Sequence, residues 1–424
     1  MMALGFAFAS LMLIGVPIAF AMGLAGAISL IAQDLRLVAV PTRMFTGIDS
    51  FVLLAAPFYI LAGELMGRSG ITQRLVKLSM LITGRVSGGT AYGCVVASIF
   101  FSGISGTAVG DAAALGQIFI KEMPKEGYTV EYSSALVVAG SMIGPIIPPS
   151  VIMVIFSAVS QVSIISLFIA GVVPGLLLGL ALAVVIFLQS RLGKGLPRSS
   201  FSMEGEKIGT VIVEGAMVLT LPVFIVGGSV SGVFTPTEAG GTAVLYTLLI
   251  GWLAFRKLDR RQIWDSLVVA ARVSASIYLI LAASEVMSYA MTFAGIDIWV
   301  RGVSDGFQSH PVVFLLLVAV FLVVVGTFLE PGPAIVIFVP LFMPIAKSLG
   351  IDPIQFAMVF ILTLTLGLST PPVGLCLFVA GKIGNVPMGR LFKALLPFFF
   401  AEKAVVILLC LVPELSSGLE RLFK

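Results

Sequence analysis

The chain has 424 residues, of which 59% are hydrophobic and 11% are charged, and its mean hydropathy is +1.14. This composition excludes an ordinary soluble domain and is typical of an all-α polytopic protein embedded in a lipid bilayer. The net charge of +4 comes from cations scattered through short loops, so we interpret them as topology signals and expect no nucleic-acid binding. One histidine and three dispersed cysteines supply neither a histidine-based metal site nor a disulfide framework.

Residues 1–67 are predicted to form scaffold helices, with membrane spans at 4–32 and 48–67. The first span has no basic start and no cleavage site, so we expect a retained helix rather than a signal peptide. The next stretch, 68–87, mixes basic and apolar residues and predicts an amphipathic arm helix at the membrane surface.

Residues 88–190 are predicted to form a first transport-core repeat. Segment 88–121 has two apolar halves that are each too short to cross about 30 Å of hydrocarbon, so we expect a re-entrant helical hairpin. Segment 132–159 is a span that the double proline Pro148-Pro149 should break, because proline lacks an N–H and clashes with the preceding turn. A further crossing is expected at 165–190.

A polar stretch at 191–208 predicts a cytoplasmic linker between the two halves. Scaffold helices are expected within 209–292, at 209–231, 237–255 and 265–291. Residues 293–310 predict a second amphipathic arm.

Residues 311–412 repeat the first core unit. They comprise a predicted hairpin at 311–346, a helix at 354–380 broken at Pro371-Pro372, and a crossing at 390–412, followed by a C-terminal tail at 413–424. The two double prolines lie 223 residues apart. At the same offset, four further pairs match: Gly103 with Gly326, Gly127 with Gly350, Gly144 with Gly367, and Pro174 with Pro397.

The matched hairpins are expected to enter from opposite sides of the membrane, which makes the repeat an inverted one, the arrangement used for alternating access. Seventeen cations, among them Arg85, Lys194 and Arg198, fall in loops assigned to the cytoplasm, against six outside, among them Lys424. This bias predicts a cytoplasmic N-terminus and a periplasmic C-terminus.

Broken helices and hairpin tips expose backbone carbonyls, which suit a small hard cation, and N–H groups, which suit a carboxylate. We therefore predict two sodium sites and no other cofactor. The expected residues of sodium site 1 are Ser102, Gly103, Ser105, Gly106, Thr107, Gly144, Pro148, Pro149 and Ser150. Those of sodium site 2 are Gly326, Thr327, Glu330, Gly367, Ser369, Thr370 and Pro371. The expected substrate-binding residues are Ser105, Asp111, Glu330 and Thr370.

Each of these residue types also has a structural explanation. Small residues permit close helix packing, and serine or threonine hydroxyls bond to the preceding helical turn. Asp111 lies one turn after the first tip and is equally explained as a helix cap.

Four motifs occur in order along the chain: the tip Ser102-Gly-Ile-Ser-Gly-Thr-Ala108, Gly127-Tyr128, Gly144-Pro-Ile-Ile-Pro-Pro-Ser150, and Gly367-Leu-Ser-Thr-Pro-Pro-Val-Gly374. Together they resemble the large membrane subunit of TRAP transporters, the tripartite ATP-independent periplasmic transporters of bacteria and archaea. The resemblance implies an elevator-type, sodium-driven importer of organic anions, carboxylates such as C4-dicarboxylates or sugar and sialic acids, in the cytoplasmic (inner) membrane. It also implies a separate small four-helix membrane subunit and a periplasmic substrate-binding protein as partners.

The main alternative within transport is a stand-alone divalent-anion/sodium symporter of similar elevator design. An intramembrane enzyme would need a Gly-x-Ser-x-Gly, His-Glu-x-x-His or paired-aspartate motif, and a primary pump would need a phosphate-binding Walker A loop. The sequence has none of these motifs, so we predict that the chain is not an enzyme.

Overall fold

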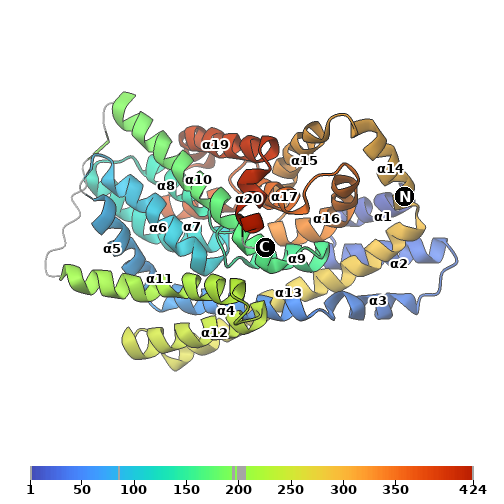
Figure 1. Ribbon diagram of the computed structural model, residues 1–424, viewed down its shortest axis with the longest axis horizontal. Helices are drawn as coiled ribbons and strands as arrows, with labels where there is room; N and C mark the ends of the chain where they lie inside the picture. The colour runs from blue at the N-terminus through green and yellow to red at the C-terminus, as the bar shows by residue number, and fades with distance from the viewer. Residues whose placement is uncertain (1, 85, 193–195, 198–206, 423–424) are drawn as a thin grey trace.

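The computed structural model describes residues 2–84, 86–192, 196–197 and 207–422, and within these ranges every regular element is helical (Figure 1). Arg85, Lys194, Arg198 and Lys424, which entered the predicted charge bias, lie outside the described residues, as does most of the predicted linker. Of the described helical segments, six are long and apolar enough to cross a membrane. They number seven if the pair of residues 298–307 and 311–326, bent by 117°, counts as one span.

The prediction of one continuous span at 4–32 is wrong. The structure has two helices, α1 (Met2–Leu13) and α2 (Ile18–Ala32), which pack against each other. The chain turns at Gly15, whose φ of +88° favours glycine, and at Pro17, which cannot continue a helix from the residues before it. With 12 and 15 residues, each helix is shorter than the roughly 30 Å of a hydrocarbon core. The orientation of the termini, which rested on counting this segment as one crossing, stays a prediction.

A long helix, α13, organises the scaffold. It packs against α2, α3 and α4 along the lower edge of the molecule in Figure 1, while α12 packs against α4. A reciprocal pair of hydrogen bonds between Thr235 and Glu238 caps the start of α12. The bounds are α3 (Ala39–Ile48), η1 (Phe51–Leu54), α4 (Ala55–Arg68), α11 (Ile208–Val230), α12 (Pro236–Leu248), η3 (Leu249–Ala254, a π-helical turn) and α13 (Arg260–Phe293).

Two shorter helices occupy the predicted arm positions. Helix α5 (Ile71–Thr83) buries one apolar face, including Ile71 and Leu75, and packs against α6 and α11. Helix α14 (Ile296–Phe307) packs against α16.

The core is built from two similar series of helices. The first series is α6 (Gly89–Ser105), α7 (Ala108–Glu122), η2 (Met123–Glu126), α8 (Val130–Ser141), α9 (Val151–Ser160) and α10 (Ile164–Leu192). The second is α15 (Pro311–Gly326), α16 (Pro331–Ser348), α17 (Pro353–Gly367), α18 (Leu375–Gly384) and α19 (Met388–Leu411). The expectation that every hairpin arm is too short to cross is wrong for α16, because its 18 residues are long and apolar enough.

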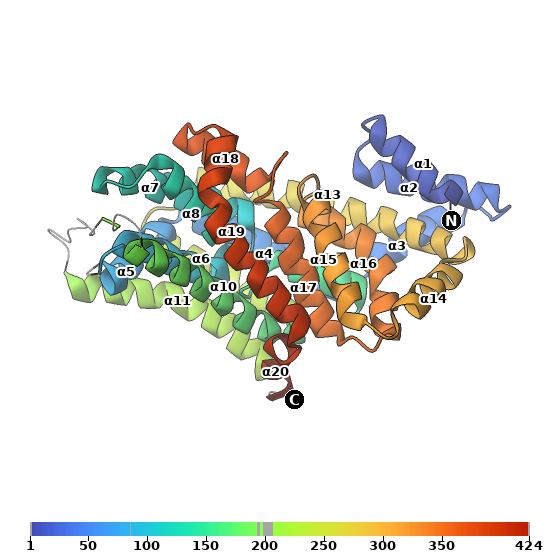
Figure 2. The same cartoon turned by 90° about the horizontal axis from the view of Figure 1, so that it is seen from above.

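The two series interleave (Figure 2). Helix α7 of the first series packs against α18 of the second, and α16 of the second packs against α9 of the first. The long helices α10 and α19 also pack against each other. The second arm of each hairpin, α7 or α16, therefore packs against the broken helix of the other series.

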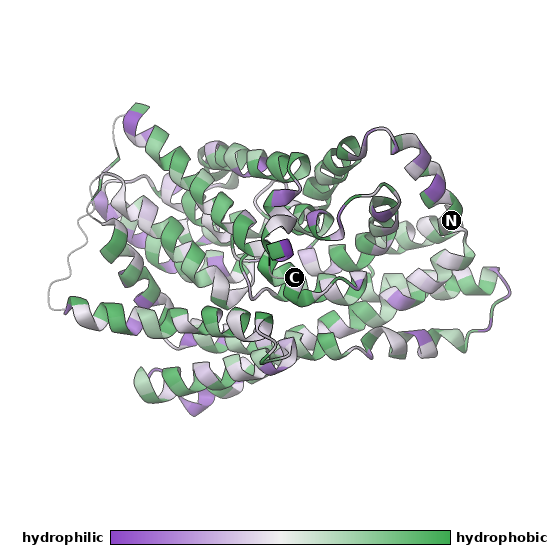
Figure 3. Ribbon diagram, in the orientation of Figure 1, coloured by the Kyte–Doolittle hydropathy of each residue, from purple (hydrophilic) through white to green (hydrophobic). Residues whose placement is uncertain are grey.

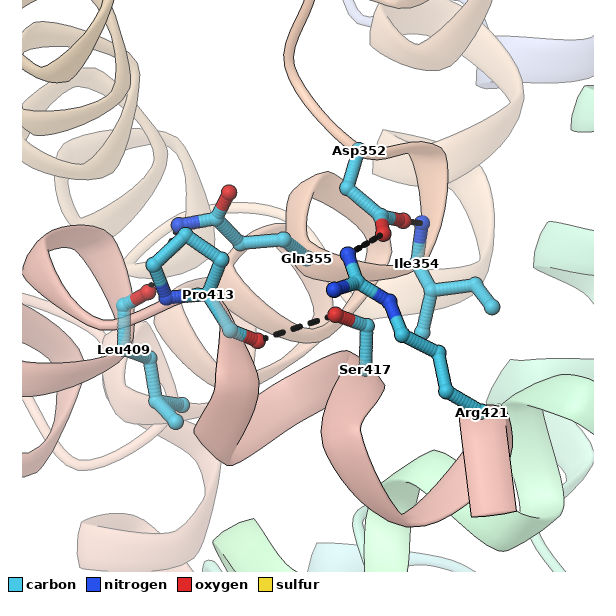
Figure 4. Close-up of polar contacts among 7 residues, drawn as sticks. All are labelled: Asp352, Ile354, Gln355, Leu409, Pro413, Ser417 and Arg421. Atoms are coloured by element: carbon cyan, nitrogen blue, oxygen red, sulfur yellow. Dashed lines mark hydrogen bonds and ion pairs between the residues drawn. The ribbon is translucent and has the colours of Figure 1, made fainter. Parts of the chain in front are cut away.

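The predicted C-terminal tail contains a docked helix, α20 (Glu414–Leu422), shown in Figure 4. Arg421 pairs with Asp352 at 3.1 Å, and Asp352 also accepts a bond from Ile354 N–H that caps α17. On the other side, Ser166 of α10 donates to Glu420. Helix α20 thus joins both series.

Hydrophobic residues dominate the helices, and many of the hydrophilic residues lie near helix ends and connections (Figure 3). Large apolar side chains such as Leu180 and Val320 are 60% and 66% exposed. This surface is unfavourable in water and suits contact with lipid or with other membrane subunits.

Candidate ion and substrate site at two helix breaks

The structure brings the first hairpin tip onto the first helix break, and we name this contact junction 1: the tip Ser105–Thr107 and the break 142–150. Gly106 ends α6 with a φ of +62°, and a Cβ added there would lie 2.9 Å from the carbonyl oxygen of Pro149. The tip can therefore approach the break this closely only with glycine. A Cβ at Gly103 would lie 3.0 Å from Pro222 Cγ of α11 and 3.4 Å from Pro148 O.

Asp111 is the charged group of junction 1, and its side chain is fully buried. Its Oδ1 accepts a hydrogen bond from Ser105 Oγ. Its Oδ2 has no hydrogen-bond partner among the described residues and lies against Gly144 of the break, where an added Cβ would overlap it. No bond from a backbone N–H to Asp111 is seen in the described part of the chain, which removes support for the helix-cap explanation.

The hydroxyls of junction 1 have different partners. Ser102 donates to Ile99 O at 2.7 Å, the back-bonding expected of a structural serine. Ser150 accepts from Met153 N–H at 3.4 Å and so caps α9. Ser105 accepts from Thr107 N–H at 3.2 Å besides donating to Asp111, so it links the tip to the acid.

Junction 2 is the corresponding contact in the second series, between the tip Thr327–Glu330 and the break 368–374. A Cβ at Gly326 would lie 3.0 Å from Gly367 Cα, and one at Gly367 would lie 2.9 Å from Gly326 O, so two glycines meet backbone to backbone. Gly374 N–H donates to Thr327 O at 3.4 Å. Gly326, Thr327 and Gly367 of the predicted sodium site 2 therefore lie where the second tip and the second break meet.

The hydroxyls of junction 2 all bond to their own helices. Thr327 donates to Val324 O at 2.7 Å, and Ser369 and Thr370 donate to Leu366 O at 2.7 and 3.0 Å. A hydroxyl that donates its proton still keeps oxygen lone pairs for a cation, so back-bonding does not exclude coordination. Glu330 is exposed at the start of α16 and makes no cap bond.

The two breaks share one backbone feature and differ in exposure. The peptide bonds Pro148–Pro149 and Pro371–Pro372 are both cis. Pro148, Pro149 and Ser150 are buried, whereas Pro372 is exposed and Pro371 is intermediate.

Helix α9 and the start of α18 connect the two junctions. Gly332, just after the second tip, faces Ile155 of α9, with 3.5 Å between an added Cβ and Ile155 Cδ1. Helix α18, which begins after the second break, packs against α7, which begins after the first tip. The tips therefore converge on one region of the core.

Two residues near this region were not predicted from the sequence as part of the site. Pro222 of α11 contacts Gly103, and its only signal is a proline inside the apolar span 209–231. Glu402 of α19 is fully buried, and neither carboxyl oxygen has a partner among the described residues. An acid inside the span 390–412 was the available signal for Glu402.

The available ligand atoms favour a hard cation. Within the described residues no three His, Cys, Asp or Glu side chains come together, so a transition-metal site has no ligand set there. The junctions instead offer carbonyl and hydroxyl oxygens and, at junction 1, the carboxylate of Asp111. Such oxygen sets suit alkali and alkaline-earth ions.

Comparison with known proteins gives several matches along nearly the whole chain. It is 34% identical to the 2,3-diketo-L-gulonate TRAP transporter large permease protein YiaN of Escherichia coli, covering 95% of this chain and 94% of YiaN. It is 33% identical to the sialic acid TRAP transporter large permease protein SiaM of Vibrio cholerae, covering 99% and 98%. It is also 35% identical to the isethionate TRAP transporter permease protein DctMQ of Oleidesulfovibrio alaskensis, covering 96% of this chain but 64% of that longer protein.

The fold is similar to that of the YdaH transporter of Alcanivorax borkumensis, with a TM-score of 0.65 and 14% identity over 88% of this chain and 86% of that chain. The relatives with assigned roles are transporter permeases, so the prediction that the chain is not an enzyme is confirmed. The family model described as tripartite ATP-independent periplasmic transporter, DctM component, matches residues 6–415. The chain therefore belongs to the DctM family of TRAP transporter large permeases.

Proposed function

We propose that the chain is the transmembrane subunit of a sodium-coupled, binding-protein-dependent importer of organic anions, working by an elevator mechanism. The observation that carries the proposal is the pair of junctions, in each of which a hairpin tip packs against a broken helix through glycines. Breaks of this kind inside a membrane protein supply backbone dipoles for ions and substrates.

At junction 1 the proposed sodium ion is bound by Asp111 Oδ2 together with oxygens of the tip and the break. A fully buried carboxylate with one unpartnered oxygen is costly unless a cation compensates its charge. Sequence reasoning placed Asp111 in the substrate-binding set and left cation coordination and a helix cap as alternatives. Its burial and its like charge favour a cation-binding role over contact with an anion.

At junction 2 the proposed sodium ion is bound by neutral oxygens only. The hydroxyls of Ser369, Thr370 and Thr327 keep acceptor lone pairs, and the break frees carbonyl groups beside them. Glu330 is exposed and is not part of this proposed oxygen set.

The proposed substrate lies between the two tips, near Ser105 and Thr370, which are both partly exposed. The N-terminal ends of α9 and α18 begin directly after the breaks and favour negative charge. The names of the relatives give 2,3-diketo-L-gulonate, sialic acid and isethionate as their substrates. All three are organic anions, which supports the same substrate class for this chain.

The elevator mechanism is proposed from the packing of the helices. The two core series interleave through the pairs α7–α18 and α9–α16, which favours their moving as one body. Helices α2, α3, α4 and α13 pack mainly among themselves and suit a fixed scaffold. The reciprocal pairs α7–α18 and α9–α16 also support an inverted repeat.

The proposed partners are a small membrane subunit and a periplasmic binding protein in a bacterial or archaeal inner membrane. Support comes from the name of the matching family, which describes a tripartite periplasmic transporter. The DctMQ relative is a longer permease protein, of which this chain covers 64%, which supports a second permease component in the same assembly.

The test is uptake by proteoliposomes that contain this chain, its small subunit and its binding protein. We expect accumulation of the anion that the binding protein carries when an inward sodium gradient is imposed. Equal accumulation when potassium replaces sodium would refute sodium coupling, and equal accumulation without the binding protein would favour the stand-alone symporter.

A further inference from the structure

A basic cavity of about 770 Å³ lies away from both junctions, where the ends of α4, α5 and α11 meet the turn after η3. Among the described residues that line it, five are cations and one, Glu214, is an acid. The five cations are Arg68, Arg74, Lys77, Lys207 and Lys257. The cavity therefore carries an excess of positive charge and suits an anion.

Part of this cavity is rigidly built. Arg74 is held by Glu214 at 2.9 Å, by the carbonyl of Gly70 at 3.0 Å, and by the ring of Phe255, whose centroid lies 3.5 Å from the guanidinium carbon. Its side chain is only 17% exposed. Arg74 therefore forms a fixed wall whose charge Glu214 already balances.

Two other cations have no charged partner among the described residues. The ammonium groups of Lys207 and Lys257 make no ion pair or hydrogen bond within the part of the chain that the structure describes, and both residues are exposed. Arg68 is only loosely paired, at 3.7 Å from Asp265 and 4.0 Å from Glu64. The lysines are flexible donors that can close on a phosphate.

Exposed apolar side chains lie on α11, which lines the cavity, and on η3, which ends shortly before the lining residue Lys257. On α11, Ile208 and Ile212 are 53% and 48% exposed, and on η3, Trp252 is 57% exposed. Exposed tryptophan together with lysine and arginine is characteristic of the membrane–water boundary. An anion bound here would thus lie at the boundary, with apolar surface beside it.

We propose that this cavity binds the phosphate headgroup of an anionic phospholipid, with the acyl chains against the exposed faces of α11 and η3. Basic pockets between membrane helices recognise such headgroups through charge and hydrogen bonds. Because the cavity joins arm helix α5 to scaffold helices α4 and α11, the lipid would brace the arm against the scaffold.

The test compares thermal stability of the delipidated full-length chain with added phosphatidylglycerol, phosphatidylcholine or inorganic phosphate. We expect a rise in the unfolding midpoint with phosphatidylglycerol that high salt reduces. The double variant Lys207→Gln/Lys257→Gln should need a phosphatidylglycerol concentration about 30-fold higher to reach half of the rise in the unfolding midpoint. The reason is that each cation near an anionic lipid contributes to the binding free energy.

A matched control is Lys121→Gln/Lys125→Gln, which removes the same charge from exposed lysines outside the cavity and should respond like the unmodified chain. An equal phosphatidylglycerol response in both double variants would overturn the proposal. An equal effect of phosphatidylcholine would do the same. A full effect of inorganic phosphate at the lipid's concentration would identify a free anion, not a lipid, as the ligand.

Discussion

Gly144→Ala is the substitution that most specifically perturbs junction 1. The added Cβ would overlap Asp111 Oδ2, and it would lie 3.0 Å from Asp111 Cγ and 3.3 Å from Ser141 O. The carboxylate has little room to retreat, because it is fully buried and its other oxygen holds Ser105. Overpacking of this kind costs about 1–3 kcal/mol. We expect a lower unfolding midpoint and, because Oδ2 is displaced, sodium affinity at this site reduced about tenfold or more.

The assay is a sodium titration of the purified chain that follows the unfolding midpoint, since an ion that binds only the folded state raises it. Gly332→Ala is the matched control, because its Cβ would make an ordinary contact of 3.5 Å with Ile155. Adding Asp111→Ala should recover part of the stability that Gly144→Ala loses. Sodium stabilisation of Gly144→Ala equal to that of Gly332→Ala would refute the reasoning.

Three further outcomes follow from the packing. Gly367→Ala should lower the unfolding midpoint by overpacking of about 1–3 kcal/mol, because its Cβ would overlap Gly326; an unchanged midpoint would contradict this contact. Glu402→Leu should raise the midpoint, because an unpartnered buried carboxyl costs about 1–3 kcal/mol, whereas a fall would mean that the carboxyl has a partner. Arg421→Ala should lower the free energy of unfolding by at most about 1 kcal/mol, because its ion pair with Asp352 is exposed. Asp352→Ala should lower it more, because it also removes the α17 cap. The reverse order would contradict the geometry in Figure 4.

Several features of the fold were readable from the sequence because they have local causes. The double prolines cannot continue a helix, so the breaks at 142–150 and 368–374 were predictable. The glycines at 103, 106, 326 and 367 indicated that segments of the chain pack closely there, and in the structure they lie where each tip meets its break. The resemblance to TRAP large permeases was confirmed by the family match over residues 6–415.

Other features depend on tertiary packing, which hydropathy does not encode. The span 4–32 was read as one helix because its apolar composition is continuous across Gly15 and Pro17. The contact of Pro222 with Gly103 joins residues more than a hundred positions apart. The bond between Ser105 and Asp111 required the tip geometry, because the sequence left a cap and a pocket role equally open for Asp111.

The central claim is that each junction binds one sodium ion. Equilibrium binding of radioactive sodium to the purified chain, to Ser105→Ala and to Thr370→Val tests it most directly, with each variant's unfolding midpoint measured without sodium as the control for folding. We expect two ions per unmodified chain and one per variant, with the midpoint changed little by Thr370→Val and lowered by Ser105→Ala, which leaves Asp111 Oδ1 without its hydrogen-bond donor. Two ions bound with unchanged affinity in both variants would contradict the claim and would leave the breaks as packing features.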